Sequence, residues 1–521
     1  MINIKIDNNN IQIPKGTTVL NAAKSVGIEI PTMCFLEGQS NHPSCMICVV
    51  KDKNTGKLFP SCAITATEGM EIISKDEEII NARKESLELL LSDHVGDCEA
   101  PCRPSCPANM NIPLMNRLIA EGKFSESNKV VKEDIALPLI LGYICPAPCE
   151  KACRRTQVDN AVSICHLKKS VAAEDLNNEN SYLPPKEKKS NKKVAIIGTG
   201  PGGLSAAFYL LKWGHECVLF DKNEEAGGTL RYEILENQLP NEAINKEVSL
   251  IKEYGAEFRM NYLITKEIYE TELKKNFDAI ILATGDFETS NFKDFEFESG
   301  KSGITIDKGT YETSEEGVFA CGNIIRSRRM AINSVAQGKI AANSANIYLK
   351  GEKPQKAHRM FNSKFGKLFE AELDEYMKEA VPEKRIELEK GKMGDFSKEE
   401  AILEAKRCMH CDCRKVDDCK LRTYSDQYNA DQRKYKFGER KTIKKYNQHD
   451  TVIYEPEKCI RCNLCVDITV KNGELTGLTS VGRGFNVQID VPFGESMKNA
   501  LTETAIKCAE ACPTGAISLK H

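Results

Sequence analysis

The chain has 521 residues, of which 41% are hydrophobic and 28% are charged, and its formal net charge is -3. This composition is typical of globular proteins without the basic excess of nucleic-acid binders, and the length predicts roughly three to five domains. We find no apolar stretch approaching about 18 residues and no signal-peptide pattern, so we expect a cytoplasmic protein with no membrane span and no nucleic-acid partner.

The cysteine content is the most informative feature of the composition. The chain has 22 cysteines, and most of them fall into closely spaced groups. In a reducing cytosol, clustered cysteines are more often metal ligands than disulfides. We therefore expect several metal centres in one chain.

The first such group follows a pattern of strand, strand and helix. Residues 2–6 and 11–13 alternate like two short strands, and TVLNAAKSVGI has the pattern of an amphipathic helix. Four thiolates suffice for a [2Fe-2S] centre, and zinc is the alternative. TVLNAA and IPTMC resemble the N-terminal domain of the complex I large iron-sulfur subunit and of iron-only hydrogenases, which implies a β-grasp ferredoxin over residues 1–80. The four candidate ligands are Cys34, Cys45, Cys48 and Cys62.

Residues 81–177 predict a helical [4Fe-4S] domain with seven cysteines. Two [4Fe-4S] clusters need eight ligands, so either one ligand is not cysteine or only one cluster is complete. His94 is either that ligand, through a neutral imidazole, or a surface residue at a helix C-terminus. The phrases CPANMNIPLMNRLIAEGKF and ICPAPCEKACRR resemble the N-terminal domain of the glutamate synthase small subunit and of dihydropyrimidine dehydrogenase. The resemblance implies one cluster on Cys98, Cys102, Cys153 and His94 and another on Cys106, Cys145, Cys149 and Cys165.

Residues 178–193 are expected to be a linker, and residues 194–350 a Rossmann-like domain. KKVAIIG predicts a buried strand and LSAAFYLLKWG a helix, and the GTGPGG turn between them places Gly198, Gly200 and Gly203 in the GxGxxG pattern. These glycines let the backbone approach a pyrophosphate at the helix N-terminus. Asp221, at the end of the next strand, is placed for a ribose hydroxyl.

Three further phrases, AGGTLRYEILENQLP, AIILATG and GVFACGN, resemble the FAD half of the glutamate synthase small subunit family. That family has a second nucleotide-binding domain after the ATG phrase, whereas only 31 residues separate Gly285 from Gly317 here, and a βαβ unit alone needs about 30. Asn323 also replaces the usual aspartate of the family. We expect FAD, with a Rossmann-like domain that binds no cofactor as the alternative. The resemblance adds Gly227, Gly228, Thr284, Gly285, Gly322 and Asn323 as cofactor-binding residues.

Residues 351–400 are rich in charged, helix-favouring residues and predict a helical bridge without chemistry. Residues 401–450 contain four cysteines within twelve residues, which indicates a [4Fe-4S] cluster or, as the alternative, a zinc site. These four candidate ligands are Cys408, Cys411, Cys413 and Cys419.

Residues 451–521 predict a [4Fe-4S] ferredoxin-like domain. The Cys-x2-Cys-x2-Cys run and a remote Cys-Pro supply four ligands, Cys459, Cys462, Cys465 and Cys512. CIRCNLC, SVGRGFNVQIDVPFG and CAEACPTGAI resemble the cluster-binding region of the complex I large subunit and hydrogenase modules. Thr469 stands where a second cluster would need a cysteine, so we expect one cluster. Cys217, Cys321 and Cys508 are expected to be packing residues.

The chain therefore predicts a multidomain α/β and α+β protein with FAD, one [2Fe-2S] and up to four [4Fe-4S] clusters. No hydrolytic motif is present and no catalytic side chain is predicted, so the cofactors must carry the chemistry. We expect an electron-relay subunit whose partners are an NAD(P)H-diaphorase (flavin) subunit, a catalytic subunit of hydrogenase, formate dehydrogenase or aldehyde oxidoreductase type, and ferredoxin. Electron bifurcation stays open. The alternatives are a self-contained NAD(P)H-dependent flavin oxidoreductase that reduces a metal or small acceptor, and an assembly scaffold.

Overall fold

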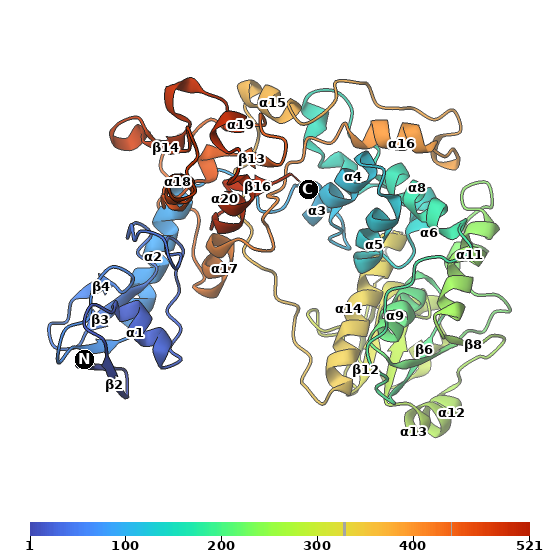
Figure 1. The fold of residues 1–521 in the computed structure, drawn as a ribbon. Coiled ribbons are helices and arrows are strands. Elements are labelled where there is room, and N and C mark those ends of the chain that lie inside the picture. Colours follow the sequence, from blue (N-terminus) through green and yellow to red (C-terminus); the bar gives the residue numbers. More distant parts are fainter. Residues whose placement is uncertain (327–329, 439, 521) are drawn as a thin grey trace. The chain divides into compact units, whose positions relative to one another are not determined.

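The computed structural model describes residues 1–326, 330–438 and 440–520, and its contacts divide the chain into two compact units (Figure 1). The chain leaves the first unit after Ala100 and returns to it at Arg359 and again at His410. Among the described helices, none is long and apolar enough to cross a membrane. Unit 1 consists of Met1–Ala100, Arg359–Glu379 and His410–His521, and unit 2 of Pro101–His358 and Ala380–Met409.

Unit 1 begins with a five-stranded sheet and a helix. Its elements are β1 (Ile2–Ile6), β2 (Asn9–Ile13), α1 (Val19–Ser25), β3 (Val49–Asp52), β4 (Leu58–Pro60) and β5 (Glu71–Ile73). Ile2, Ile4 and Ile6 alternate along β1 and are all buried, so one face of the sheet forms a core against α1. The strand order is β2-β1-β5-β3-β4, with β1 and β5 parallel.

Helix α2 (Glu77–Asp93) connects this sheet to the rest of unit 1. Asp76 caps its first turn by accepting a hydrogen bond from Ile79 N–H, and the helix ends immediately before His94. The buried Arg83 ties the helix to the sheet by donating to the carbonyls of Val49 and Ser74.

The remainder of unit 1 packs small strand pairs against short helices. Strands β13 and β16 pair antiparallel, as do β14 and β15, and helices α18 and α20 share one apolar core with them. The bounds are α15 (Glu370–Met377), α17 (Lys420–Gln427), β13 (Val452–Tyr454), α18 (Leu464–Lys471), β14 (Thr479–Val481), β15 (Gln488–Asp490), α19 (Met497–Ala500), α20 (Ala505–Ala511) and β16 (Ile517–Leu519).

Unit 2 opens with a helical region. Residues such as Met115, Ile119 and Val131 recur at helical spacing and are fully buried, so the helices pack around one apolar core. The helices are α3 (Cys102–Ser105), α4 (Ile112–Ala120), α5 (Phe124–Asp134), α6 (Pro138–Ile144), α7 (Pro148–Lys151) and α8 (Ile164–Leu176).

A parallel five-stranded sheet of order β12-β9-β6-β7-β8 follows in unit 2. Helices α9 and α14 lie side by side against one face of this sheet (Figure 1), and an aromatic cluster that includes Phe292 and Tyr269 covers the other. The bounds are β6 (Lys193–Ile197), α9 (Pro201–Lys212), β7 (Glu216–Phe220), α10 (Thr229–Tyr232), α11 (Asn241–Glu253), β8 (Glu257–Arg259), α12 (Lys266–Ile268), α13 (Lys274–Asn276), β9 (Ala279–Leu282), β10 (Ser299–Gly300), β11 (Gly303–Ile304), β12 (Val318–Ala320) and α14 (Ala331–Leu349).

The segment expected to be a helical bridge is mostly irregular. Within residues 351–407, the only helices longer than one turn are α15 and α16 (Lys398–Ala405). Pro354 and Pro382 interrupt the charged sequence, and proline disfavours the helical conformation of the residue before it. Charged composition alone therefore overestimated the helix here.

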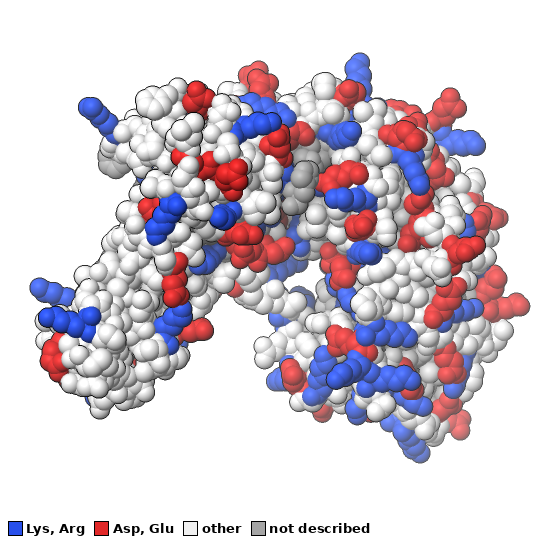
Figure 2. Space-filling view, in the orientation of Figure 1, with Lys and Arg blue, Asp and Glu red and all other residues white. Residues whose placement is uncertain are grey.

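Acidic and basic side chains are mixed on the surface. Figure 2 shows Lys and Arg interspersed with Asp and Glu over the visible face. This distribution accords with the small formal net charge of -3.

Candidate functional site

The four cysteines of the N-terminal sheet domain converge in its loops. All four residues are at most 3% exposed. Hydrogen bonds from the thiols of Cys45 and Cys62 hold the pKa of Cys34 well below its usual range, and one from Cys62 lowers the pKa of Cys48 to about 7. The same contacts and burial raise the pKa of Cys45 and Cys62. The four thiols thus lie within hydrogen-bonding reach of one another, as ligands of one iron centre must.

The C-terminal module of unit 1 gathers a second group. Cys459, Cys462, Cys465 and Cys512 line one small cavity. Arg461 and Asn463 have positive φ, which bends the chain so that the cysteines on either side face the same point. The neighbouring Cys508 lies outside this lining, fully buried in the apolar core.

A third group lies in the helical region of unit 2. Cys106, Cys145, Cys149 and Cys165 line one cavity that is otherwise almost wholly apolar. The Cys165 thiol lowers the pKa of Cys145 to about 6 by hydrogen bonding, whereas burial raises the pKa of Cys106. These are the four cysteines that the resemblance assigns to one cluster.

A fourth group in unit 1 joins residues more than 300 positions apart. The N–H of Cys413 donates to the carbonyl of Cys98 at 3.2 Å, and both residues are buried. Burial raises the pKa of Cys98 to about 11 and that of Cys419 to about 12, and the charges of Cys413 and Cys98 raise the pKa of Cys419 further. Each thiol therefore resists ionisation unless a cation is present.

His94 belongs to the same part of unit 1. Burial lowers the pKa of His94 to about 4, so the imidazole is neutral, and its Nδ1 is buried without a hydrogen-bond partner among the described residues. The positive charge of Lys458 lowers the pKa of His94, Cys98 and Cys413 alike. A neutral imidazole nitrogen that is buried without a hydrogen-bond partner is a suitable ligand for a metal centre.

The boundary between the two units runs through two of the cysteine groups expected from sequence. Cys98 lies in unit 1 with Cys413 and Cys419, whereas Cys102 and Cys153 lie in unit 2. The four-cysteine segment is also divided, because Cys408 belongs to unit 2 and the chain returns to unit 1 at His410, just before Cys411. Both motifs therefore contribute cysteines to each of the two units.

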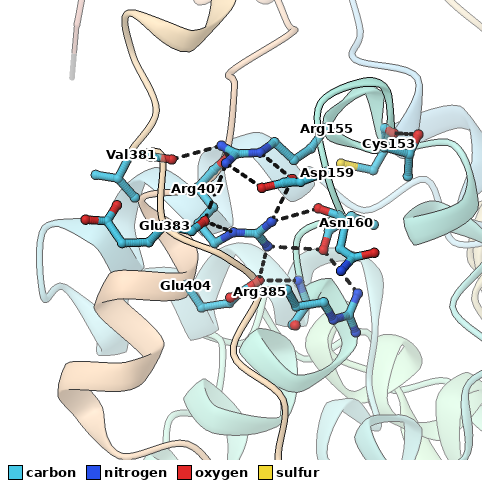
Figure 3. A network of polar contacts seen from close by, with 12 residues as sticks. Cys153, Arg155, Asp159, Asn160, Val381, Glu383, Arg385, Glu404 and Arg407 are labelled. Atoms are coloured by element: carbon cyan, nitrogen blue, oxygen red, sulfur yellow. Dashed lines mark hydrogen bonds and ion pairs between the residues drawn. The ribbon is translucent and has the colours of Figure 1, made fainter.

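A network of buried arginines follows Cys153 in unit 2 (Figure 3). Arg155 forms two hydrogen bonds to Asp159, at 2.7 and 2.9 Å, and donates to the carbonyl of Arg407 at 3.1 Å. Arg407, which is fully buried, pairs with Asp159 at 2.9 Å and with Glu404 at 2.7 Å. Since Cys153 precedes Arg155 by two residues and Cys408 follows Arg407, the network fixes both cysteines. Cys102, Cys153 and Cys408 pack partly buried against the same apolar core.

The parallel sheet of unit 2 carries a large cavity at the carboxyl ends of its strands. A Cβ on Gly198 would lie 2.3 Å from the carbonyl oxygen of Ala283, and one on Gly203 would lie 2.0 Å from that of Gly198, so both positions exclude side chains. A Cβ on Gly200 would have no neighbour within 4 Å, and Gly200 lines the cavity. The turn is thus shaped for a phosphate-bearing ligand at the N-terminus of α9.

The cavity lining includes most of the residues named from sequence. Asp221, Gly228, Thr284, Gly285, Gly322 and Asn323 line it with Gly198 and Gly200, whereas Gly203 and Gly227 do not. Sequence reasoning did not name other residues of the lining, which lie at the end of α10, in loops and on α14. These are chiefly Tyr232, Glu233, Tyr262, Ser290 and Ser334.

Both carboxylate oxygens of Asp221 already accept hydrogen bonds within the protein, which its motif position does not predict. Its Oδ2 accepts hydrogen bonds from the N–H and hydroxyl of Thr199, at 2.8 and 2.6 Å, and its Oδ1 accepts two from Asn223 at 3.0 Å. The residue is 8% exposed. Asp221 therefore braces the glycine turn, and a ribose hydroxyl would have to share an oxygen already in use.

The thiol groups, the orphaned His94 nitrogen and the glycine turn all fit the predicted cofactors. Among the described residues, no three His, Cys, Asp or Glu side chains are spaced to hold a single metal ion.

Three segments of the chain match known domain families. Residues 1–77 match a 2Fe-2S iron-sulfur cluster binding domain, and residues 78–180 match domain II of dihydropyrimidine dehydrogenase, which carries a 4Fe-4S cluster. Residues 196–260 match an NAD(P)-binding Rossmann-like domain.

Curated relatives share the region around these domains. The chain is 38% identical over 189 residues to the NADPH-Fe(3+) oxidoreductase subunit beta of Geobacter sulfurreducens, with 36% of this chain and 28% of the relative covered. It is 36% identical over 182 residues to the glutamate synthase [NADPH] small chain of Bacillus subtilis, covering 34% and 36%. It is 33% identical over 207 residues to the NADP(+)-dependent formate dehydrogenase subunit beta of Moorella thermoacetica, covering 36% and 29%.

The chain thus matches little more than a third of the length of any of these three relatives. The chain therefore contains iron-sulfur domains and a Rossmann-type nucleotide domain, and part of it is similar to subunits of oxidoreductases.

Proposed function

We propose that this chain relays electrons between an NAD(P)H-diaphorase subunit, ferredoxin and a catalytic oxidoreductase subunit, using FAD, one [2Fe-2S] and up to four [4Fe-4S] clusters. The observation that carries the proposal is the presence of five separate groups of cysteines in one chain with one dinucleotide-type cavity. A relay needs many cofactors and few reactive side chains, and this chain has that balance.

Each cluster is assigned to one group of ligands. Cys34, Cys45, Cys48 and Cys62 would hold the [2Fe-2S] centre in a β-grasp domain, and the cavity-lining sets supply two [4Fe-4S] sites. His94, Cys98, Cys413 and Cys419 would hold a third [4Fe-4S] cluster, and Cys102, Cys153 and Cys408 supply three ligands of a fourth.

The Rossmann-like domain would bind FAD through its backbone. Amides at the N-terminus of α9 face the position of a pyrophosphate, and Gly200 leaves room for it. Asp221 orients this turn through Thr199. FAD, when bound, supplies the exchange of electrons in pairs or singly.

The short segment after β9 supports the need for a diaphorase partner. Residues 286–316 form two 3-10 turns and the small β10–β11 pair. A second Rossmann unit would need at least one further βαβ element of about 30 residues. NAD(P)H would therefore be oxidised on another subunit and its electrons passed to this chain.

A self-contained NAD(P)H oxidoreductase is the second candidate, because a relative is named as an NADPH-Fe(3+) oxidoreductase subunit. Stopped-flow absorbance of the purified, cofactor-loaded chain with NADH or NADPH separates the two functions. The relay predicts slow flavin bleaching by the isolated chain and rapid bleaching after addition of a diaphorase subunit. Rapid bleaching of the isolated chain would overturn the relay in favour of the second candidate.

A further inference from the structure

A buried lysine faces the four-cysteine cavity of unit 2. Lys168 lies on α8 three residues after Cys165, so the two side chains project from the same side of the helix. Lys168 is 4% exposed and lines the cavity together with Cys106, Cys145 and Cys149.

The charge of Lys168 has no partner within the described protein. Its ammonium makes no hydrogen bond or ion pair with a described residue, whereas the adjacent buried Lys169 pairs with Asp395 at 2.9 Å and donates to two carbonyls. Glu247, a buried carboxylate whose pKa burial raises and the charge of Lys168 lowers, forms no ion pair with it and accepts hydrogen bonds from Leu139 and Ile140 N–H. The charges that act most on Lys168 are those of the four cysteines that line the cavity.

An isolated ammonium in an apolar interior costs several kcal/mol or loses its proton. A cluster held by four thiolates carries net negative charge, and each added electron makes it more negative. A fixed cation beside the cluster therefore stabilises the reduced state more than the oxidised state.

The same cavity adjoins the nucleotide-binding cavity through α14. Ile332 in the first turn of this helix lines the cysteine cavity, and Ser334, two residues later, lines the nucleotide cavity. A cluster here would be a close electron-transfer neighbour of a bound flavin.

We propose that Lys168 raises the reduction potential of the cluster held by Cys106, Cys145, Cys149 and Cys165, so that this cluster takes single electrons from the adjacent reduced flavin. The inference rests on the cluster and flavin of the proposed function. The step adds one electron to the cluster and removes one from the flavin, and it makes or breaks no bond at Lys168. Lys168 is thus a positioning residue whose charge acts on the cluster.

An EPR-monitored redox titration of the full chain tests this inference with Lys168→Met and Lys168→Arg. The signal of this cluster is identified as the one that Cys149→Ser removes. Lys168→Met should shift the reduction equilibrium at least tenfold towards the oxidised state, which is about 59 mV for one electron. Lys168→Arg should stay close to the wild type because it keeps the charge. Lys169→Met is the matched control on the same helix and should leave this potential unchanged.

The outcomes separate the inference from the function on which it rests. An unchanged potential in Lys168→Met would overturn the role of Lys168 while leaving the cluster assignment intact. If Lys168→Met does not retain the cluster, full iron content and a wild-type potential in Lys168→Arg would support a charge requirement, and loss of iron in both would show that Lys168 only packs. If Cys149→Ser removed neither iron nor any EPR signal, the cluster itself, and with it the proposed function at this site, would be refuted.

Discussion

Units 1 and 2 each place a buried lysine beside candidate cluster ligands, but only one of these lysines has a carboxylate partner. In unit 1, Lys458 pairs with Glu455, and both side chains are about 5% exposed or less. In unit 2, Lys168 has no such partner among the described residues. In unit 1 the carboxylate of Glu455 neutralises the lysine charge, whereas in unit 2 the lysine charge would act on the bound cluster. Clusters with similar ligands in the two units should therefore differ in reduction potential.

The packing around the paired lysine is tight. A Cβ on Gly96 would lie 2.7 Å from Cε of Lys458, and the carbonyl of Glu457 accepts a hydrogen bond from Val95 N–H. The segment before the first C-terminal ligand, Cys459, is thereby fixed against the segment between His94 and Cys98. Lys458 thus belongs to the framework of unit 1, whereas the proposed role of Lys168 is to act on the cluster that its cavity would hold.

The largest expected effect comes from removing a ligand in the split group of unit 1. Cys98→Ser and Cys413→Ser should each remove about four iron atoms per chain and the same EPR signal, and the double variant should lose no more, because both residues bind one cluster. Iron analysis with EPR measures both. Cys217→Ser, at a buried cysteine on β7 of the Rossmann-like sheet, should keep all iron.

Different EPR signals lost from Cys98→Ser and Cys413→Ser would show that the two cysteines serve separate clusters. The division of ligands between the units would then be refuted.

A large effect on stability should follow from breaking the pair in unit 1. Glu455→Gln leaves the Lys458 ammonium buried without its carboxylate, which should cost about 3–5 kcal/mol of unfolding free energy. Urea unfolding, followed by the loss of cluster absorbance, measures this cost. Glu37→Gln is the control, because the Lys24–Glu37 pair is exposed and should contribute less than about 1 kcal/mol. Equal costs in the two variants would contradict the buried pair as a structural element.

A smaller, pH-dependent effect should come from Glu474 in the C-terminal module. Although partial burial opposes the shift, hydrogen bonds from Thr502, Glu503 and Thr504 lower the pKa of Glu474 to about 2. Its stabilisation is present above the ordinary carboxyl pKa of about 4.5 and is lost as the pH falls towards 2.

Glu474→Gln should therefore cost about 1–2 kcal/mol at pH 7, after allowance for solvent screening, and progressively less below pH 4.5. Denaturant unfolding at a series of pH values measures the difference. Glu495→Gln, which alters an exposed hydrogen bond to Asn499, should show little pH dependence. A cost for Glu474→Gln that did not vary with pH would refute the role of its ionised carboxylate.

Local spacing revealed some of these sites and misled at others. The Cys-x2-Cys-x2-Cys run and the GxGxxG turn each form their site from residues that are close in the chain, so spacing alone predicts their geometry. The grouping of Cys106 with Cys145, Cys149 and Cys165 required a family resemblance. The close spacing from Cys408 to Cys419 predicts one site, and the contacts of the fold assign Cys408 to unit 2 and the other three cysteines to unit 1. No local pattern shows that the chain changes unit after Ala100 and again after Met409.

Hydrogen bonding explains a second difference. The position of Asp221 after a buried strand predicted a ribose contact, but Thr199 and Asn223 occupy both carboxylate oxygens. Thr199 inside the glycine turn was the sequence signal for these hydrogen bonds, but the GxGxxG pattern accepts any residue at that position. The number of hydrogen bonds that a carboxylate accepts depends on which donors the fold brings near it, and the spacing of a motif does not reveal those donors.

The most direct test of the electron relay is the cofactor content of the anaerobically purified chain. Metal analysis, acid-labile sulfide and flavin extraction should give up to about 18 iron atoms, matching sulfide and one FAD per chain. Colourless protein that contains zinc in place of iron and lacks flavin would contradict the account.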